Sequence, residues 1–431
     1  MNIDLLEFQI ESHTDAIIKV IGVGGGGGNA VNHMFKEGIH NVSFALCNTD
    51  NQALMESPVP VKVQLGSHTT GGLGAGNKPE IASKAAEESL DLIESLLNDG
   101  TRMVFITAGM GGGTGTGAAP VIARVAKEMG ILTVGIVTIP FVFEGSRKIV
   151  QALKGVEEIS KNVDALLVIN NERLRDIYSD LTMLNAFAKA DDTLTIAAKS
   201  IAEIITVHGH MNLDFADVNT TLKDGGVAIM SSGIGKGNNR INEAIKDALH
   251  SPLLNNNDVF NSKKILINIC FGEENPLMME EMNALHDFMS KFSNEIEVIW
   301  GAAVDKSLME EVKVILLATG FSINNVPGIR EIRDEETKAE ELERKLKEDE
   351  LKKQEAKDRD LIEKYYGKAG LQSLSTNNYR QEPFILTIEE LDDDKLLEAL
   401  EKTPVFKREK TFNPRTFHTD IQQQSSTLFD L

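Results

Sequence analysis

GMGGGTGTG, residues 109–117, is the stretch that decides the fold of this chain. It follows an apolar, strand-like run at 103–108 and precedes a helical pattern that begins at Ala118. Glycines at such a turn leave room for backbone N–H groups to approach a phosphate, and the N-terminus of the following helix favours its negative charge. Thr114 and Thr116 add hydroxyl donors. The stretch therefore predicts a phosphate-binding turn in an α/β fold.

A second glycine cluster, GVGGGGG at 22–28, also follows a strand-like run and opens a helix. By itself it is ambiguous. Gly22, Gly24 and Gly27 satisfy the G-x-G-x-x-G pattern of a dinucleotide site, and Asp50 lies where the ribose-binding acid of such a site belongs. A Rossmann-type NAD(P)-dependent oxidoreductase is therefore an alternative. A merely tight turn is disfavoured, because a glycine run costs conformational entropy that packing does not require.

A third cluster, GGLGAGN at 71–77, completes the set. Two glycine turns at the ends of parallel strands can hold a longer polyphosphate from both sides, and a third can close over its terminal phosphate. There is no Walker A motif, because Gly235 and Lys236 have Met230 where the leading glycine should stand. The nine histidines are scattered, so the oxidoreductase alternative lacks a proton-transferring histidine in a matching motif. The clusters together predict a nucleoside triphosphate site of a different design.

Apolar runs and helical stretches alternate from about residue 16 to 320. Strands are expected at 17–21, 43–47, 103–107, 132–138, 165–169, 227–230, 265–271, 297–300 and 312–318. Between the two groups of strands, residues 193–207 predict a long, largely buried helix, and further helices are expected at 240–250 and 278–292. The pattern predicts a Rossmann-like, mainly parallel sheet and a smaller α/β domain, joined through the long helix.

The composition is acidic, with 65 Asp and Glu against 44 Lys and Arg and a formal net charge of -21. Such a surface repels nucleic acid and anionic membranes, so neither is expected as a direct partner. Cys47 and Cys270 lie in apolar runs and are predicted to be reduced core thiols of a cytoplasmic protein. The acidic N-terminus has no apolar segment of a signal peptide, and no apolar run is long enough to span a membrane.

The character of the chain changes after Pro327. Residues 334–364 carry 13 acidic and 9 basic side chains, which predicts a solvated, partly helical linker; a coiled coil is the alternative, although the leucines do not keep a heptad. Residues 371–380 are polar and predicted to be disordered. An amphipathic patch at 383–408 interrupts this disorder before the polar end of the chain.

Four motifs together resemble the FtsZ family of bacterial tubulin-like GTPases: GMGGGTGTG at 109–117, IGVGGGGGNAV at 21–31, CNTD at 47–50 and NLDFADV at 212–218. The resemblance covers about residues 14–322. It implies a GTP-binding domain at 14–192, a core helix at 193–211 and a GTPase-activating domain at 212–322. Around these it implies a flexible extension at 1–13, a disordered linker at 323–390, a partner-binding peptide at 391–409 and a variable tail at 410–431.

The resemblance also implies which residues hold the nucleotide. The α- and β-phosphates would meet Gly25, Gly26, Gly27, Gly28 and Asn29; the γ-phosphate would meet Gly71 and Gly72; the β- and γ-phosphates would lie in the turn of Gly112, Gly113, Thr114 and Gly115. Glu144 would bind the ribose, and Lys148 stands where the family often has Arg, which replaces a bidentate fork by a point charge.

Guanine would be recognised by Asn171 and Asp192, because a carboxylate accepts two hydrogen bonds from guanine that adenine cannot donate. The preceding residue, commonly Asn in the family, is Asp191 here, so which acid contacts the base stays open. Phe187 would stack on the base; plain core packing is the alternative.

Asp214 and Asp217, with Asn212 beside them, are the expected catalytic residues. If the segment is helical, their spacing places both carboxylates on one face, where they can coordinate a cation or polarise an attacking water; helix-capping acids are the alternative. The resemblance implies that this loop completes the site of the next subunit in a head-to-tail filament, with Mg²⁺ accompanying GTP. An inactive tubulin-like scaffold is disfavoured, because the glycine clusters and both acids are intact.

The end of the chain carries one further motif. Pro404, Phe406 and Arg408 resemble the family's docking peptide for membrane-tethering and regulatory division proteins such as FtsA, although Lys407 replaces a usually apolar residue. The resemblance thus implies a cytoplasmic GTPase that converts GTP to GDP in the mid-cell division ring, without inserting into the membrane.

Overall fold

The computed structural model describes residues 16–39, 41–177, 182–206, 209–211, 213–250, 259–293 and 295–326, and helical residues between 351 and 367 with gaps. The chain separates into two units, Met1–Thr337 and Lys338–Leu431, and the fold and the site described below belong to the first. The predicted extension at 1–13, the peptide at 391–409 with Pro404, Phe406 and Arg408, the tail at 410–431, and Asn212 lie outside the described residues.

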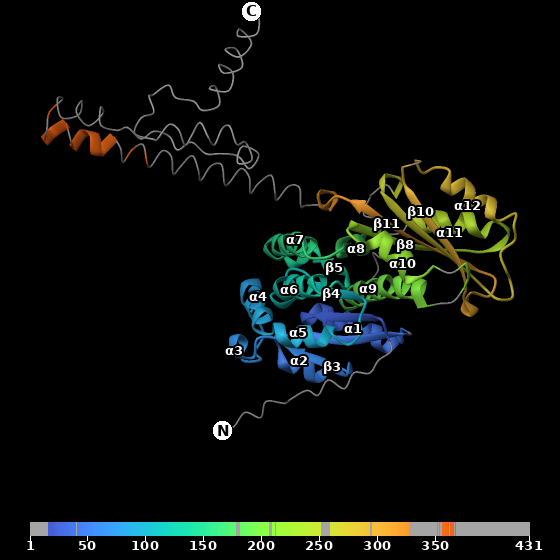
Figure 1. Cartoon of the computed structure of the whole chain (residues 1–431), viewed down its shortest axis with the longest axis horizontal. Coiled ribbons are helices and arrows are strands. Elements are labelled where there is room, and N and C mark those ends of the chain that lie inside the picture. Colours follow the sequence, from blue (N-terminus) through green and yellow to red (C-terminus); the bar gives the residue numbers. More distant parts are fainter. Residues whose placement is uncertain are drawn as a thin grey trace, which may run out of the picture. The chain divides into compact units, whose positions relative to one another are not determined.

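The described strands form one sheet of eleven strands (Figure 1). Its order is β3 (Val61–Gln64), β2 (Val42–Asn48), β1 (Ile18–Val23), β4 (Met103–Gly109), β5 (Leu132–Ile139), β6 (Ala165–Asn170), β8 (Gly226–Gly235), β11 (Val312–Phe321), β9 (Lys264–Phe271), β10 (Glu297–Val304) and β7 (Gly209–Met211). From β3 to β8 all neighbours are parallel; β11 is antiparallel to β8 and β9, and β7 to β10. The buried, β-branched strands suit a sheet covered on both faces.

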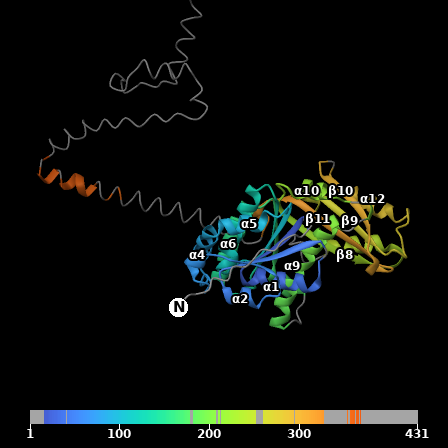
Figure 2. The ribbon, with the colours of Figure 1, turned by 60° about the horizontal axis from the view of Figure 1, so that its bottom comes forward.

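Helices cover both faces of the sheet, so the molecule has three layers. One face carries α4 (Pro79–Glu88), α5 (Leu90–Leu97), α6 (Thr114–Glu128), α7 (Ser146–Ser160), α11 (Arg240–Leu249) and α12 (Met282–Met289). The other carries α1 (Gly24–Glu37), α2 (Asn51–Glu56), α9 (Met183–Thr206) and α10 (Phe215–Leu222). Helix α9 lies beside α1 (Figure 2). The short helices α3 (Ser67–Thr70) and α8 (Asn171–Ile177) lie in connections.

The predicted α/β class with a mainly parallel sheet is confirmed, and Cys47 and Cys270 are buried free thiols as expected. Burial raises the pKa of the Cys47 thiol to about 12. The cluster at 22–28 opens a helix as predicted, since α1 begins at Gly24. Helix α6 begins at Thr114 rather than at Ala118, so the turn after β4 is limited to residues 110–113.

The long helix also differs from the prediction. Helix α9 begins at Met183 rather than 193, since the Thr182 hydroxyl accepts a hydrogen bond from the Asn185 amide at 3.3 Å and its carbonyl accepts one from Ala186 at 2.9 Å. It ends at Thr206, and the backbone of Gly209–Met211 pairs with β10 instead of continuing the helix. Strand β3 was not predicted, because its run of four residues is short.

The sheet is continuous between the two predicted halves. Ala165, Leu166 and Leu167 of β6 pair with Gly226, Val227 and Ala228 of β8. Because β6 and β8 are parallel, both start at the same edge of the sheet, and the carboxyl ends of β1, β4, β5 and β6 form the opposite edge.

Candidate functional site

A cavity of about 370 Å³ lies at the carboxyl ends of β4, β5 and β6, between the N-termini of α1 and α6. This is where ligands bind in open α/β sheets. Its lining consists of Gly25, Gly26, Asn29, Gly109, Met110, Gly112, Gly113, Thr114, Gly115, Thr138, Pro140, Glu144, Lys148, Asn171, Phe187, Ala190, Asp191 and Leu194. Most of the predicted nucleotide-binding residues are therefore brought together; Gly27, Gly28, Gly71, Gly72 and Asp192 are outside this lining.

The glycine run at the start of α1 has two different roles. A Cβ on Gly27 would lie 2.2 Å from the Thr107 carbonyl oxygen, and one on Gly24 would lie 2.8 Å from the Gly115 nitrogen. These two glycines let α1 pack against β4 and α6. A Cβ on Gly25 or Gly28 would meet nothing within 4 Å. Of these two glycines, only Gly25 lines the 370 Å³ cavity. Gly28 lines a separate small hollow of about 50 Å³.

The N-termini of α1 and α6 are both open to an anion. Neither helix has a side-chain cap or an acidic residue in its first turn, so their first N–H groups are available to a ligand. Thr114 lines the cavity, and its hydroxyl lies 2.7 Å from that of Thr49. Thr116, expected to offer a donor, instead accepts a hydrogen bond from the Gly111 amide at 2.9 Å and fixes the turn.

Gln151 of α7 holds the same turn from behind. Its side-chain amide donates to the carbonyls of Gly111 and Gly112 at 3.1 and 3.0 Å. Gly111 has φ of 98°, a left-handed conformation that favours glycine. No motif in the sequence marks Gln151, because its role depends on how α7 packs on the turn.

One acidic and one basic side chain, Glu144 and Lys148, lie together in the cavity lining. The Glu144 carboxylate accepts hydrogen bonds from the Phe141 amide at 2.9 Å and from the Lys148 ammonium at 2.5 Å. Glu144 is the more buried of the two, and Lys148 is partly exposed. Each Glu144 oxygen thus has one donor, and the pair places a carboxylate and a positive charge in the lining of the cavity.

The cavity lining also contains Asn171 and Asp191, two side chains that can accept hydrogen bonds. Asn171 is only 5% exposed, and its side-chain oxygen has no hydrogen-bond partner among the described residues. Burial raises the pKa of Asp191 to about 6, opposed by the charge of nearby His33. A buried acceptor without a partner is costly, so Asn171 favours a ligand that presents an N–H donor, and Asp191 lies in the same cavity lining.

The two neighbouring acids of α9 face different surroundings. Asp191 lines the cavity, whereas the Asp192 carboxylate pairs with the Lys189 ammonium at 2.6 Å and does not line it. Phe187 is 36% exposed at the cavity wall, with its ring edge-on to Phe141 at 5.2 Å between centroids. Phe187 is therefore accessible to a ligand and packed on one side.

The third glycine cluster, at 71–77, adjoins the turn at 109–117 but does not line the cavity. A Cβ on Gly113 would lie 3.0 Å from the Lys78 nitrogen, just after the cluster. The Gly72 carbonyl accepts a hydrogen bond from the Asn51 amide at 3.0 Å. Gly71 is exposed, so the cluster stands beside the turn at 109–117 as a rim.

The predicted catalytic acids form a reciprocal cap on α10. The Asp214 carboxylate accepts from the amides of Ala216 and Asp217 at 2.7 and 3.0 Å, and the Asp217 carboxylate accepts from the Asp214 amide at 2.9 Å. Asp214 precedes the helix, so the two acids do not share a helix face as the spacing suggested. The Arg102 guanidinium lies over the Phe215 ring at 5.0 Å.

This contact locates the acids at the far edge of the sheet. Arg102 immediately precedes β4, whose other end, Gly109, borders the cavity. The seven residues of β4 span about 20 Å at ~3.3 Å per residue. Within one chain, the acids and the cavity are therefore at opposite ends of the strand.

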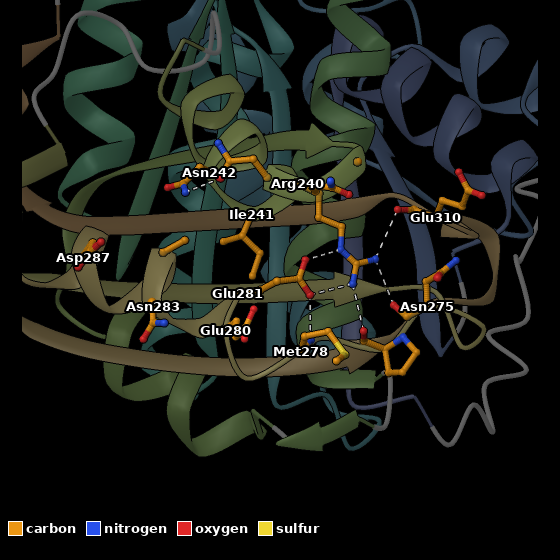
Figure 3. A pocket seen from close by; sticks show the side chains of 15 residues that line it. Arg240, Ile241, Asn242, Asn275, Met278, Glu280, Glu281, Asn283, Asp287 and Glu310 are labelled. Carbon is orange, nitrogen blue, oxygen red and sulfur yellow. Dashed lines mark hydrogen bonds and ion pairs between the residues drawn. The ribbon is translucent and has the colours of Figure 1, made fainter.

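A larger hollow, about 910 Å³, lies between the starts of α11 and α12 (Figure 3). Its centre is Arg240, whose guanidinium donates to the Glu281 carboxylate at 2.7 and 3.0 Å and to the carbonyls of Asn275, Pro276 and Glu310. All of its donors are thus used inside the protein, and its function is to tie three connections together. The smaller cavity is the better candidate site, because its helix N-termini and Asn171 lack partners.

Comparison with known proteins agrees with this geometry. Residues 17–179 match the family model described as Tubulin/FtsZ family, GTPase domain, and residues 226–322 match the FtsZ family, C-terminal domain. The chain is 53% identical over 410 residues to cell division protein FtsZ of Porphyromonas gingivalis, covering 95% of this chain and 89% of that protein. It is 46% identical over 323 residues to FtsZ of Wigglesworthia glossinidia brevipalpis, covering 74% and 83%.

The chain belongs to the FtsZ family. Among solved structures, an empty FtsZ dimer from M. jannaschii matches with a TM-score of 0.66 and 40% identity, covering 71% of this chain and 89% of that one. CetZ1 from Haloferax volcanii matches at 21% identity with a TM-score of 0.65, which shows the shared fold alone. The predicted tubulin/FtsZ-like fold is thereby confirmed.

Membership in the FtsZ family makes the chain a member of a GTPase family of cell division, with guanine nucleotide as the ligand class. The NAD(P)-dependent oxidoreductase finds no support, since the matched model over the glycine clusters is a GTPase domain. Among the helices described by the structure, none combines the length and apolar character needed to cross a membrane.

Proposed function

We propose that this chain binds GTP in the 370 Å³ cavity and hydrolyses it to GDP and phosphate only when the acids of a second copy close on that cavity. The observation that carries the proposal is the length of β4 between the cavity and the Phe215–Arg102 contact. An acid about 20 Å away cannot act on a phosphate in the same chain. The FtsZ from M. jannaschii forms a dimer, which supports association between copies.

The residues around the cavity fit GTP. The open N-termini of α1 and α6 would hold the phosphates, with Lys148 adding a positive charge. Glu144 would accept from the ribose hydroxyls. Asn171 and Asp191 would accept from guanine, whose N–H groups supply the donors that this end of the cavity lacks. Phe187 would contact the base.

Mg²⁺ would enter with the nucleotide. The described residues contain no group of three or more His, Cys, Asp and Glu side chains placed to hold an ion. The phosphates would therefore be its main ligands, and the ion would neutralise their charge when bound.

Asp214 and Asp217 would orient a water and accept its proton as it attacks the terminal phosphate in the neighbouring subunit. A contact between the acid end of one copy and the cavity end of the next joins two different surfaces, so it does not close and builds a filament. Such filaments would form the mid-cell ring in the cytoplasm. Residues 14–192, the core helix and 212–322 would then be the working parts of one subunit.

The end of the chain would connect the filament to other proteins. Pro404, Phe406 and Arg408 match a docking peptide, and an amphipathic peptide beyond a charged linker suits coupled folding and binding. Membrane-tethering proteins such as FtsA would be its partners, with no role for nucleic acid or direct membrane insertion. Loss of mid-cell localisation in Phe406→Ala is the test; normal localisation would exclude this peptide.

The shared site is tested by the concentration dependence of hydrolysis. Because each working site needs two subunits, phosphate release should rise more steeply than linearly with protein concentration near a threshold. Sedimentation with GTP, and not with GDP, should show polymer above the same threshold. A rate strictly proportional to protein down to high dilution would refute the shared site.

A further inference from the structure

Glu88, the last residue of α4, binds the segment that leads into the third glycine cluster. Its carboxylate accepts from the amides of His68 and Thr69, both at 2.9 Å, and from the Thr69 hydroxyl at 2.6 Å. These donors form the first turn of α3, directly before Gly71. Hydrogen bonds from the Thr69 side chain and the His68 amide lower the pKa of Glu88 to about 2, so it is charged at neutral pH.

The third glycine cluster has little regular structure of its own. Gly71 and Gly72 have φ of 59° and 76°, and Gly74, Gly76 and Asn77 are also left-handed. Backbone in this conformation continues neither a helix nor a strand, so its path is set by its contacts with neighbouring segments, among them the hydrogen bond from the Asn51 amide to the Gly72 carbonyl. Those contacts decide where Gly71 and Gly72 stand relative to the cavity.

The cluster at 71–77 is hydrogen-bonded to Thr49, which in turn contacts the cavity wall. The Gly74 amide donates to the Thr49 carbonyl at 3.1 Å, and the Thr49 hydroxyl lies 2.7 Å from that of Thr114 in the cavity wall. On the other side, the approach to the cluster is bound to the end of α4. Gly66 donates its amide to the Ser89 hydroxyl at 2.9 Å, and Glu88 binds the next turn.

We propose that Glu88 is a positioning residue for the terminal phosphate of GTP: by capping Ser67–Thr70 it holds Gly71 and Gly72 where they meet that phosphate, and so sets the preference for GTP over GDP. The proposal rests on the proposed function of the cavity and names a residue that does not line it. Glu88 acts at a distance, because its bonds end at Thr69. GDP lacks the group that the cluster would meet, so only GTP binding should depend on Glu88.

The test measures the affinity of the full chain for GDP and for a non-hydrolysable GTP analogue, below the concentration at which it assembles. Glu88→Ala should weaken the analogue about 10-fold and GDP less than about 2-fold, since charge-assisted hydrogen bonds are the stronger class. Glu88→Gln, which keeps one acceptor oxygen, should fall between. Glu87→Gln is the matched control, because Glu87 pairs with Arg124 at 2.6 Å and touches none of this segment.

Hydrolysis in assembled protein gives a second readout. Glu88→Ala should raise KM for GTP more than it lowers kcat. A general loss of structure would instead lower kcat, because a smaller fraction of the protein would be active. If Glu88→Ala melts before it can be assayed, Thr69→Val removes one bond only and should lower the GTP preference by a smaller factor. An unchanged preference in these variants, or equal weakening of both nucleotides, would overturn the role of Glu88. If the unsubstituted chain bound neither nucleotide, the proposed function would fail as well.

Discussion

The N-termini of α6 and α10 begin with opposite chemistry. Helix α6 starts Thr114-Gly-Thr-Gly, without a side-chain cap or an acid in its first turn. Helix α10 starts with Asp214 and Asp217, which satisfy each other's amides. Both are helix N-termini with the same partial positive charge. The N-terminus of α6 leaves this charge available to a ligand. At the N-terminus of α10, the carboxylates of Asp214 and Asp217 neutralise it. One molecule thus carries an anion site at one edge of its sheet and an acidic surface at the other.

The largest effect is expected from substitutions of the acids that cap α10. Asp214→Ala removes the cap, so it should cost about 1 kcal/mol of stability and slow hydrolysis ~10²–10⁴-fold, without loss of GTP binding. Asp214→Asn separates the two roles, because Asn caps helices as well as Asp does. It should keep the melting temperature and still lose hydrolysis. If Asp214→Asn hydrolyses GTP normally, the acids are structural caps only.

Mixing two defective chains shows whether the acids act in trans. Gly113→Ser should damage the cavity, since its Cβ would press on Ala75 at 3.1 Å and on the Lys78 nitrogen at 3.0 Å, while its acids stay intact. An Asp214→Asn chain keeps its cavity. Together they should recover hydrolysis wherever an intact cavity meets intact acids, provided sedimentation shows both in the filament. No recovery in such mixed filaments would mean that the acids do not act on the neighbouring cavity.

Substitutions of two glycines of α1 test which positions of the glycine run are needed for packing. Gly27→Ala places a methyl 2.2 Å from the Thr107 carbonyl, in rigid backbone, and should destabilise the fold by about 1–3 kcal/mol. Gly28→Ala meets nothing within 4 Å and should leave stability unchanged or raise it by up to ~1 kcal/mol, because alanine favours the helix. Thermal melts of the two variants decide this. Equal destabilisation would mean that the run serves helix geometry rather than packing.

The sequence was enough to predict the α/β class and most of the strands, because these depend on local patterns. The sequence could not show which glycines of the run at 22–28 are needed for packing and which have free space beside them, since that depends on how closely α1 approaches β4. It could not tell whether Asp214 and Asp217 share a helix face, because the answer depends on where α10 begins. Gln151 and Glu88 had no signal, as their partners are far away in sequence.

The choice between Asp191 and Asp192 is the same kind of problem. Consecutive residues of a helix point about 100° apart, so only the position of α9 against the cavity separates them. The sequence analysis favoured Asp192 by resemblance and left the choice open. The structure has Asp191 in the cavity wall and Asp192 paired with Lys189. Which acid contacts guanine remains a prediction, and pH distinguishes them.

Asp191 is expected to make GTP affinity depend on pH. Its pKa is raised from 3.8 to about 6 by burial, so the nucleotide-free fold favours the protonated form. That contribution to stability is full below pH 3.8 and is lost as the pH rises through 6. Bound guanine should reverse the preference, because its N–H groups need the carboxylate as an acceptor. GTP affinity should therefore be constant well above pH 6 and fall about 10-fold for each pH unit below it.

Two substitutions test this assignment, with fluorescence titration of GTP across pH 5–8 as the measurement. Asp191→Asn should bind GTP more weakly at pH 7.5, show a flat pH profile, and give a nucleotide-free chain that melts higher, since a buried charge has been removed. Asp192→Asn should change affinity less than about 2-fold, because its pair with Lys189 is partly exposed and such pairs contribute little. His33→Gln should move the midpoint upward, as the charge of His33 lowers the pKa of Asp191. If Asp192→Asn instead abolishes the pH dependence while Asp191→Asn retains it, Asp192 is the residue that recognises guanine, and α9 must turn its next residue toward the cavity when the nucleotide binds.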